Sequence, residues 1–356
     1  MANSFYQTTT IPKLYVSYPL WQYANGALDS INSNFNVSEE DAVRMIQLDP
    51  SNTTELSNVN NGFNVINYRI VPETDDFTSV IDSGLWNFDF CAVLGHNLAS
   101  ASARMEIQAG SDIDNSADVL NSSNIVNFVS GSYPEYDGWS LFNINEKPTN
   151  DHRGFRFGFL PLQNQSFTET PIQIGSIMWG KTFTFPQNCN LNTTTTFDYG
   201  IKQKQTLSGK TISSANWTKP NNWLTEPFGL TEAFGERGDN FQRRSGRRNW
   251  TLSFDSLAPE KTMNQLMMMN SNGWTAQDNH SVAADGKSLY NINNAVDFYT
   301  NVVHRTMGGH LPMVLQLDKD DPSPQNFAIV RLKKNYKISQ KTPNLYNIKI
   351  TLQEQI

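Results

Sequence analysis

The residue best suited to proton transfer in this chain is His96, one of five histidines, which follows the apolar run Phe88 to Leu94 and precedes Asn97. At the end of a strand, a histidine can act as a catalytic base when a nucleophile and an acidic partner lie beside it. Ser100 and Ser102 follow within a stretch of small residues, but neither lies in a GxSxG nucleophile motif. We therefore favour a structural role for Gly95-His96-Asn97, as the corner between two strands.

Metal-binding chemistry has two weaker candidates. His304 and His310 flank a Gly-Gly pair, but a histidine that closes a helix as a cation and a histidine in a turn are the favoured interpretations. Asp112, Asp114 and Asp118 could offer oxygen ligands to Ca²⁺. Their spacing does not match an EF-hand, so a solvated acidic turn is favoured and calcium binding stays open.

Arginines form one dense basic cluster, at Arg243, Arg244, Arg247 and Arg248. Guanidinium groups bind phosphates or carboxylates by a two-pronged contact. The chain as a whole is acidic, with a net charge of −7, so nucleic acid is not an expected partner. We expect the cluster to lie at a boundary between subunits, with DNA that passes through a ring as the lesser alternative.

The composition indicates a mainly β protein. Of its 356 residues, 38% are hydrophobic, 12% are aromatic and only 17% are charged, and Asn, Ser and Thr are frequent. The two cysteines, Cys91 and Cys189, are too few for a disulfide framework and lack the spacing of a zinc site. We expect no signal peptide and no membrane-spanning segment, and synthesis in a reducing cytoplasm.

Patterning along the chain predicts three regions. Residues 1–60 are expected to be an irregular arm with one short helix at 38–46, whose aromatic residues pack on another domain or subunit. Residues 61–186 contain short alternating strands, such as Phe155, Phe157 and Phe159, which predict a β-sandwich. Residues 187–356 are expected to hold an exposed hairpin or long loop, one or two helices and a clear final strand.

Two stretches carry a resemblance to a known family. Residues 87–112, NFDFCAVLGHNLASASARMEIQAGSD, resemble a recurrent segment of tailed-bacteriophage virion proteins, in which it lies in a galactose-binding-like β-sandwich. Residues 245–257 and 294–356 together resemble phage tail-tip or distal-tail proteins. In that family, a β-barrel related to tail-tube subunits, with a helix packed on it, assembles into rings.

This resemblance implies a structural component of a virion tail: a tail-tip, distal-tail or adjoining minor tail protein, assembled in the host cytoplasm. It implies no enzymatic activity and no cofactor. The expected partners are further copies in a ring or other homo-oligomer, and other tail proteins. We expect Trp250, Phe254, Tyr346 and Ile350 to form the core of the C-terminal barrel.

Two other functions remain as alternatives. The first is a carbohydrate-binding module for attachment to a host surface glycan, with Tyr133, Tyr136 and Trp139 in the loop SGSYPEYDGWS as sugar-stacking residues. In the competing interpretation, this loop packs on its own domain. The second alternative is a glycan-degrading enzyme, which is the least favoured because no catalytic constellation is visible.

Overall fold

The structure is a computed structural model of the chain. It describes residues 10–24, 28–33, 37–56, 64–70, 88–110, 113–114, 119–120, 126–144, 154–161, 166–168, 171–215, 247–262, 297–323, 326–333 and 336–355. Strands dominate these residues, so the prediction of a mainly β chain is confirmed.

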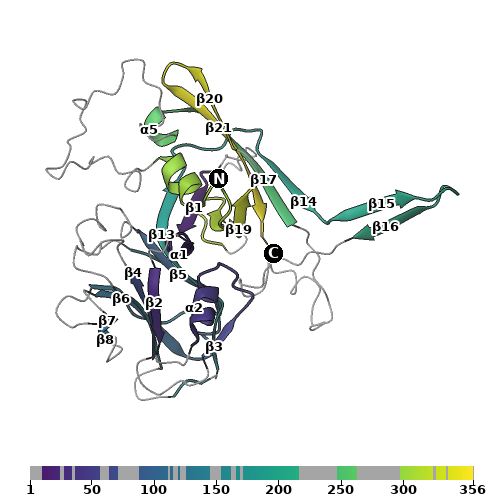
Figure 1. The fold of residues 1–356 in the computed structure, drawn as a ribbon. Coiled ribbons are helices and arrows are strands. Elements are labelled where there is room, and N and C mark those ends of the chain that lie inside the picture. Colours follow the sequence, from purple (N-terminus) through teal and green to yellow (C-terminus); the bar gives the residue numbers. More distant parts are fainter. Residues whose placement is uncertain are drawn as a thin grey trace, which may run out of the picture.

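A ten-stranded antiparallel sheet runs through the molecule (Figure 1). Its strands, in spatial order, are β10 (Gly138–Asn143), β5 (Phe90–His96), β13 (Ser176–Thr184), β1 (Lys13–Ser17), β18 (Met313–Gln316), β19 (Phe327–Leu332), β21 (Leu345–Glu354), β17 (Arg247–Leu257) and β14 (Thr194–Asp198), while β20 (Lys337–Thr342) pairs with β21. The two ends of this order, β10 and β14, are therefore edge strands.

A five-stranded sheet packs on one part of the large sheet. Its order is β2 (Leu28–Ser33), β4 (Asn64–Ile70), β11 (Gly154–Pro161), β6 (Ala103–Gly110) and β9 (Val126–Ser132). The predicted alternation of Phe155, Phe157 and Phe159 is confirmed, since all three are fully buried. They share one core with Val93 and Trp179 of the large sheet, which is the arrangement of a β-sandwich.

The remaining elements are short. Three two-stranded pairs join β3 (Thr54–Leu56) to β12 (Ile172–Ile174), β7 (Ile113–Asp114) to β8 (Val119–Leu120), and β15 (Ile201–Gln205) to β16 (Thr211–Ala215). The helical elements are α1 (Pro19–Ala24), α2 (Glu39–Met45), α5 (Pro259–Thr262) and the π-helix η3 (Tyr299–His304). Helix α2 confirms the helix predicted at 38–46, with Ser38 accepting a hydrogen bond from the backbone N–H of Asp41 at 3.1 Å.

The N-terminal region is not the irregular arm that the sequence predicted, over the residues that the structure describes. Strand β1 lies in the middle of the large sheet, between β13 and β18. Tyr18 and Trp21 are buried in the sandwich core rather than laid on a surface. Their burial is stabilised by the guanidinium of Arg305, which lies 4.6 Å and 4.0 Å from the two ring centroids.

The C-terminal strands do not close into the expected barrel within the described part of the chain. A barrel requires its first and last strands to pair with each other. Here β18 pairs with β1, and β1 pairs in turn with β13, so the sheet continues into the sandwich instead of closing. The domain boundary predicted between residues 186 and 187 falls just after β13. Side chains of β13 belong to both cores, since Trp179 lies in the sandwich core and Phe183 in the C-terminal core.

The C-terminal core lies on the same face of the large sheet as the sandwich core. Trp250, Phe254 and Ile350 are buried there as predicted, and Val302 of η3 covers them. Tyr346 is only partly buried, because it lies at the end of β21 that pairs with β20 beyond the core. On the opposite face a third, smaller core contains Tyr15, Phe90, Val314 and Phe327, among others.

Candidate functional site

His96 is the last residue of strand β5 and lies at the corner that follows this strand. Its Nε2 lies 2.9 Å from Ser140 Oγ, and its Nδ1 lies 3.4 Å from the backbone N of Leu98, which donates to it. When Nδ1 accepts from Leu98, the neutral ring carries its proton on Nε2 and donates to Ser140. The acid nearest in sequence to Ser140, Asp137, instead accepts from the backbone N–H and the hydroxyl of Ser100.

Burial also suppresses the charge of His96. The side chain is 3% exposed, and desolvation lowers its pKa to about 4, although Asp137 acts in the opposite direction. His96 is therefore a neutral, buried side chain that links the end of β5 to Ser140 of β10. These contacts agree with the corner that the sequence favoured over a catalytic base.

Neighbouring residues explain why the corner needs Gly95 and Asn97. Gly95 has a φ of +66°, and a Cβ at this position would overlap the carbonyl oxygen of Pro50. The Asn97 side chain donates to the Pro171 carbonyl at 3.1 Å and accepts from the Gln173 N–H at 2.8 Å. Asn97 thus ties β5 to the segment that leads into β12.

The two candidate metal sites gain no support from side-chain geometry. His304 packs its ring against Trp21, and burial, with a smaller effect of Arg305, lowers its pKa, so a cation at this helix end is disfavoured. Within the described ranges, no three His, Cys, Asp or Glu side chains lie close enough together to hold a metal ion. Asp112 and Asp118 lie outside the described residues, so the calcium hypothesis stays a prediction.

The arginine cluster is only partly described. Arg243 and Arg244 lie outside the described residues. Arg248 forms a largely buried ion pair with Glu354, at 2.6 Å between Nη2 and Oε1, and its guanidinium lies 4.9 Å from the ring of Trp250. The Arg248 side chain is therefore engaged within its own chain, and a role for the cluster between subunits stays a prediction.

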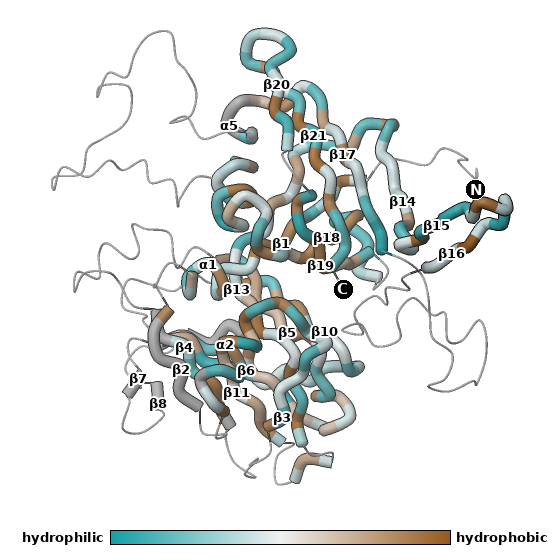
Figure 2. The backbone as a smooth tube through the Cα atoms, turned by 45° about the vertical axis from the view of Figure 1, so that its right-hand side comes forward, coloured by the Kyte–Doolittle hydropathy of each residue, from teal (hydrophilic) through white to brown (hydrophobic). Residues whose placement is uncertain are grey.

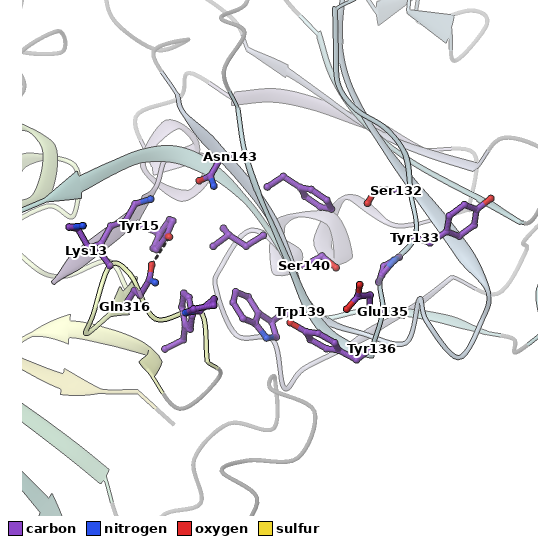
Figure 3. A pocket seen from close by; sticks show the side chains of 16 residues that line it. Lys13, Tyr15, Ser132, Tyr133, Glu135, Tyr136, Trp139, Ser140, Asn143 and Gln316 are labelled. Carbon is purple, nitrogen blue, oxygen red and sulfur yellow. Dashed lines mark hydrogen bonds between the residues drawn. The ribbon is translucent and has the colours of Figure 1, made fainter. Parts of the chain in front are cut away.

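The three aromatic residues singled out in the sequence, Tyr133, Tyr136 and Trp139, line one cavity of about 460 Å³ (Figure 3). We call this cavity the groove. Tyr133 and Tyr136 are 47% and 44% exposed, whereas Trp139 is buried and packs against Phe327 with the two rings tilted and their centroids 4.4 Å apart. The loop therefore packs on its own chain through Trp139 and presents the two tyrosines to solvent.

Residues far away in the sequence complete the other end of the groove. Lys13 and Tyr15 come from β1, and Gln316 comes from β18 (Figure 3). The Tyr15 hydroxyl donates to Gln316 Oε1 at 2.8 Å, and the Lys13 ammonium lies 4.7 Å from the Tyr15 ring centroid. No sequence spacing marks these residues as partners of the loop, because only the pairing of β1 with both halves of the sheet brings them there.

The groove is lined by charges of both signs, which are Glu135, Lys13 and Lys319. Glu135 lies on one wall. On the other wall, the turn that contributes Lys319 and Pro322 also carries Asp318, Asp320 and Asp321, which we call the acidic turn. Lys319 is neutralised by Asp320, at 2.7 Å. The residues that line the groove include side chains from both faces of edge strand β10. Leu141 packs on the third core, and Phe142 packs on the sandwich core.

A second feature projects from the opposite edge of the sheet. Strands β15 and β16 pair with each other and extend away from the body (Figure 1); residues 201–215 are named the ribbon here. Apolar side chains on it are exposed, including Ile201, Leu207 and Ile212. Figure 2 shows brown, hydrophobic segments among polar ones along β15 and β16. The exposed hairpin expected in the C-terminal region is confirmed by this feature.

Comparisons with known proteins give little beyond this geometry. No protein-family model and no curated protein matches the chain. One solved structure that it resembles is "CpGH89CBM32-6 produced by Clostridium perfringens", with 10% identity over 43% of this chain and 92% of that one, at a TM-score of 0.28. At that TM-score the likeness carries no argument about function. Among the described residues, no helix has the length and apolarity needed to cross a membrane.

Proposed function

We propose that the chain is a non-catalytic structural component of a bacteriophage tail, which assembles with copies of itself through subunit contacts. The observation that carries this proposal is the ribbon. It leaves Ile201 and Ile212 more than half exposed, and among the described residues its two strands pair with each other and with no further strand. A two-stranded hairpin is at best marginally stable alone in water. Contact with the surface of a partner would stabilise the ribbon and cover its apolar side chains.

The edges of the large sheet support the same proposal. Both β10 and β14 end the order of strands, and edge strands invite pairing or coverage by another chain. The resemblance of residues 87–112 and of the C-terminal part to tail proteins adds the biological setting. The interior of the described chain is filled by aromatic and aliphatic side chains, which is compatible with a structural role.

Oligomeric state tests the proposal directly. Purified full-length protein is examined by mass photometry over a range of concentrations and by electron microscopy. We expect closed rings or other defined homo-oligomers, and we expect replacement of residues 201–215 by Gly-Gly to yield monomers. A matched control is the double variant Lys337→Glu/Lys349→Glu, which changes a cross-strand pair of lysines on β20 and β21 away from the ribbon. Folded monomers of the unmodified protein at all concentrations would contradict the proposal.

Glycan binding is a second candidate, favoured by one observation: Tyr133 and Tyr136 present exposed rings beside the groove. Aromatic rings stack on the apolar faces of sugars. A glycan array probed with the full chain, and with Tyr133→Ala/Tyr136→Ala as control, tests this candidate. Binding by the unmodified protein that the double variant loses supports it, and the absence of binding removes it.

A further inference from the structure

The geometry points to a specific contact: we propose that the groove of one copy receives the ribbon of a second copy. This inference rests on the proposed assembly function and names the surface through which it acts. The occupant is a segment of the same chain, residues 201–215. The receiving surface consists of the tyrosines of the 133–136 loop, edge strand β10 and the acidic turn.

Charge favours this pairing. The ribbon carries Lys202, Lys204 and Lys210 and contains no Asp or Glu. Glu135 lines the groove together with Lys13 and Lys319, and the three aspartates of the acidic turn adjoin Lys319, so these side chains together carry a net negative charge. Opposite charges on two facing surfaces guide their encounter and fix their register. An acidic glycan or a second acidic segment would meet repulsion at the same surface.

The side-chain pattern of the ribbon favours the same match. Directly paired residues of two antiparallel strands lie on one face. Lys204 pairs with Ile212, and Lys202 pairs with Ser214, so one face combines two lysines with an exposed isoleucine. The groove offers two exposed tyrosine rings beside Glu135, while its two lysines, Lys13 and Lys319, come from β1 and from the acidic turn. Burying Ile212 against these rings removes apolar surface of both copies from water.

Topology makes the contact intermolecular and repeatable. The ribbon follows β14 at one edge of the ten-stranded sheet, and the groove follows β10 at the other edge. The two surfaces are therefore different and are carried at opposite edges. A contact between unlike surfaces of identical subunits propagates head to tail, and it ends only when the copies close into a ring.

A charge-reversal cycle tests the contact. Lys202→Glu/Lys204→Glu is expected to weaken self-association at least about tenfold, measured as the dissociation constant by mass photometry or sedimentation. Glu135→Lys/Asp320→Lys is expected to weaken it similarly. Mixing these two variants pairs each reversed surface with its reversed partner, so association between them should recover. All four positions are exposed, and circular dichroism checks that each variant is folded. Lys337→Glu/Lys349→Glu again serves as control.

Cross-linking gives a second, independent measurement. One preparation carries Tyr136→Cys and another carries Ile212→Cys, and the mixture is treated with a short bis-maleimide. Both native cysteines are buried, so they do not compete. We expect mixed dimers from this pair of variants and none when Lys341→Cys replaces the ribbon variant.

The outcomes separate the two levels of the proposal. If ribbon reversal disrupts assembly while groove reversal and cross-linking have no effect, the ribbon docks elsewhere; the inference fails and the assembly function stands. If neither reversal alters defined oligomers, the inference fails and assembly uses another surface. If the unmodified protein is monomeric and the groove binds a glycan that Glu135→Lys/Asp320→Lys abolishes, both the inference and the assembly function fail.

Discussion

Two segments of this chain form short strands and behave in opposite ways as structure. Apolar and aromatic residues predominate in the N-terminal segment 13–24, whereas the ribbon is mostly polar with isolated apolar residues. The first becomes the central strand and a helix, with Leu14, Val16 and Tyr18 fully buried. The second leaves every residue of β15 exposed. The difference shows that a strand with several large apolar side chains is buried between two cores. A strand with isolated apolar side chains among lysines and glutamines stays exposed.

The largest expected effect that tests this contrast is a loss of stability in β1. Leu14→Ala removes a fully buried side chain from the C-terminal core, so it should lower the free energy of unfolding by roughly 3 kcal/mol. Urea unfolding followed by tryptophan fluorescence measures the change. A loss under about 0.5 kcal/mol would mean that β1 is an accessory strand and would remove the contrast.

Acid sensitivity should arise in the sheet and not in the ribbon. Burial lowers the pKa of His96 to about 4, below its value in the unfolded chain, so the unfolded state binds more protons between the two pKa values. Above about pH 6.5, His96 is neutral in both states and does not reduce the free energy of unfolding. Between pH 7 and pH 5, its protonation in the unfolded state lowers that free energy by about 2 kcal/mol.

His96→Gln isolates this contribution, because glutamine keeps a donor toward Ser140 but does not titrate. Unfolding measured from pH 7 to pH 5 should show a shallower loss for this variant. Asp89 acts in the opposite sense, since burial raises its pKa and its protonation favours the folded state, and it is present in both proteins. The protein without the ribbon should keep the full acid sensitivity of the unmodified protein. Equal slopes for His96→Gln and the unmodified protein would exclude this role.

A smaller effect is expected at the helix that the sequence predicted inside the N-terminal region. Ser38→Ala removes the oxygen that accepts from the N–H of Asp41, which should cost about 1 kcal/mol. Thermal unfolding gives the measurement, and Ser38→Asp is the matched control because aspartate caps equally well. Identical stability of all three proteins would show that α2 is held by its packing alone.

The smallest effect is expected for an exposed apolar side chain of the ribbon. Ile212→Ala on the ribbon should change the unfolding free energy of the dissociated protein by less than about 0.5 kcal/mol, because the side chain is already exposed. The measurement is urea unfolding at a concentration where the protein is monomeric, with Leu14→Ala in parallel. A loss as large as that of Leu14→Ala would show that the ribbon folds back on its own chain.

Local features of the fold could be predicted from sequence because their causes are local. The alternation of Phe155, Phe157 and Phe159, the capped helix α2 and the buried Ile348 and Ile350 of β21 follow from side-chain periodicity and hydrogen-bonding groups within a few residues. The alternation within β21 failed only at Tyr346, where the pattern continues past the end of the core.

Long-range features could not be predicted because their causes lie in pairing between distant strands. No local pattern shows that β1 joins β13 to β18 and so prevents a barrel from closing. The candidate site shares this limit. Tyr133, Tyr136 and Trp139 could be found from their loop, but Lys13 and Gln316 reach the groove only through the neighbours of β1.

The continuity of the large sheet has a consequence for shape beyond the single molecule. Since β1 and β13 are shared by both halves, the halves cannot swivel about a hinge without breaking backbone hydrogen bonds. Adjacent strands of a sheet are rotated relative to one another, so the angle between the first and last strands accumulates across the sheet. If copies join edge to edge, this angle sets the curvature of the array. The backbone of one chain therefore determines how many copies complete a turn.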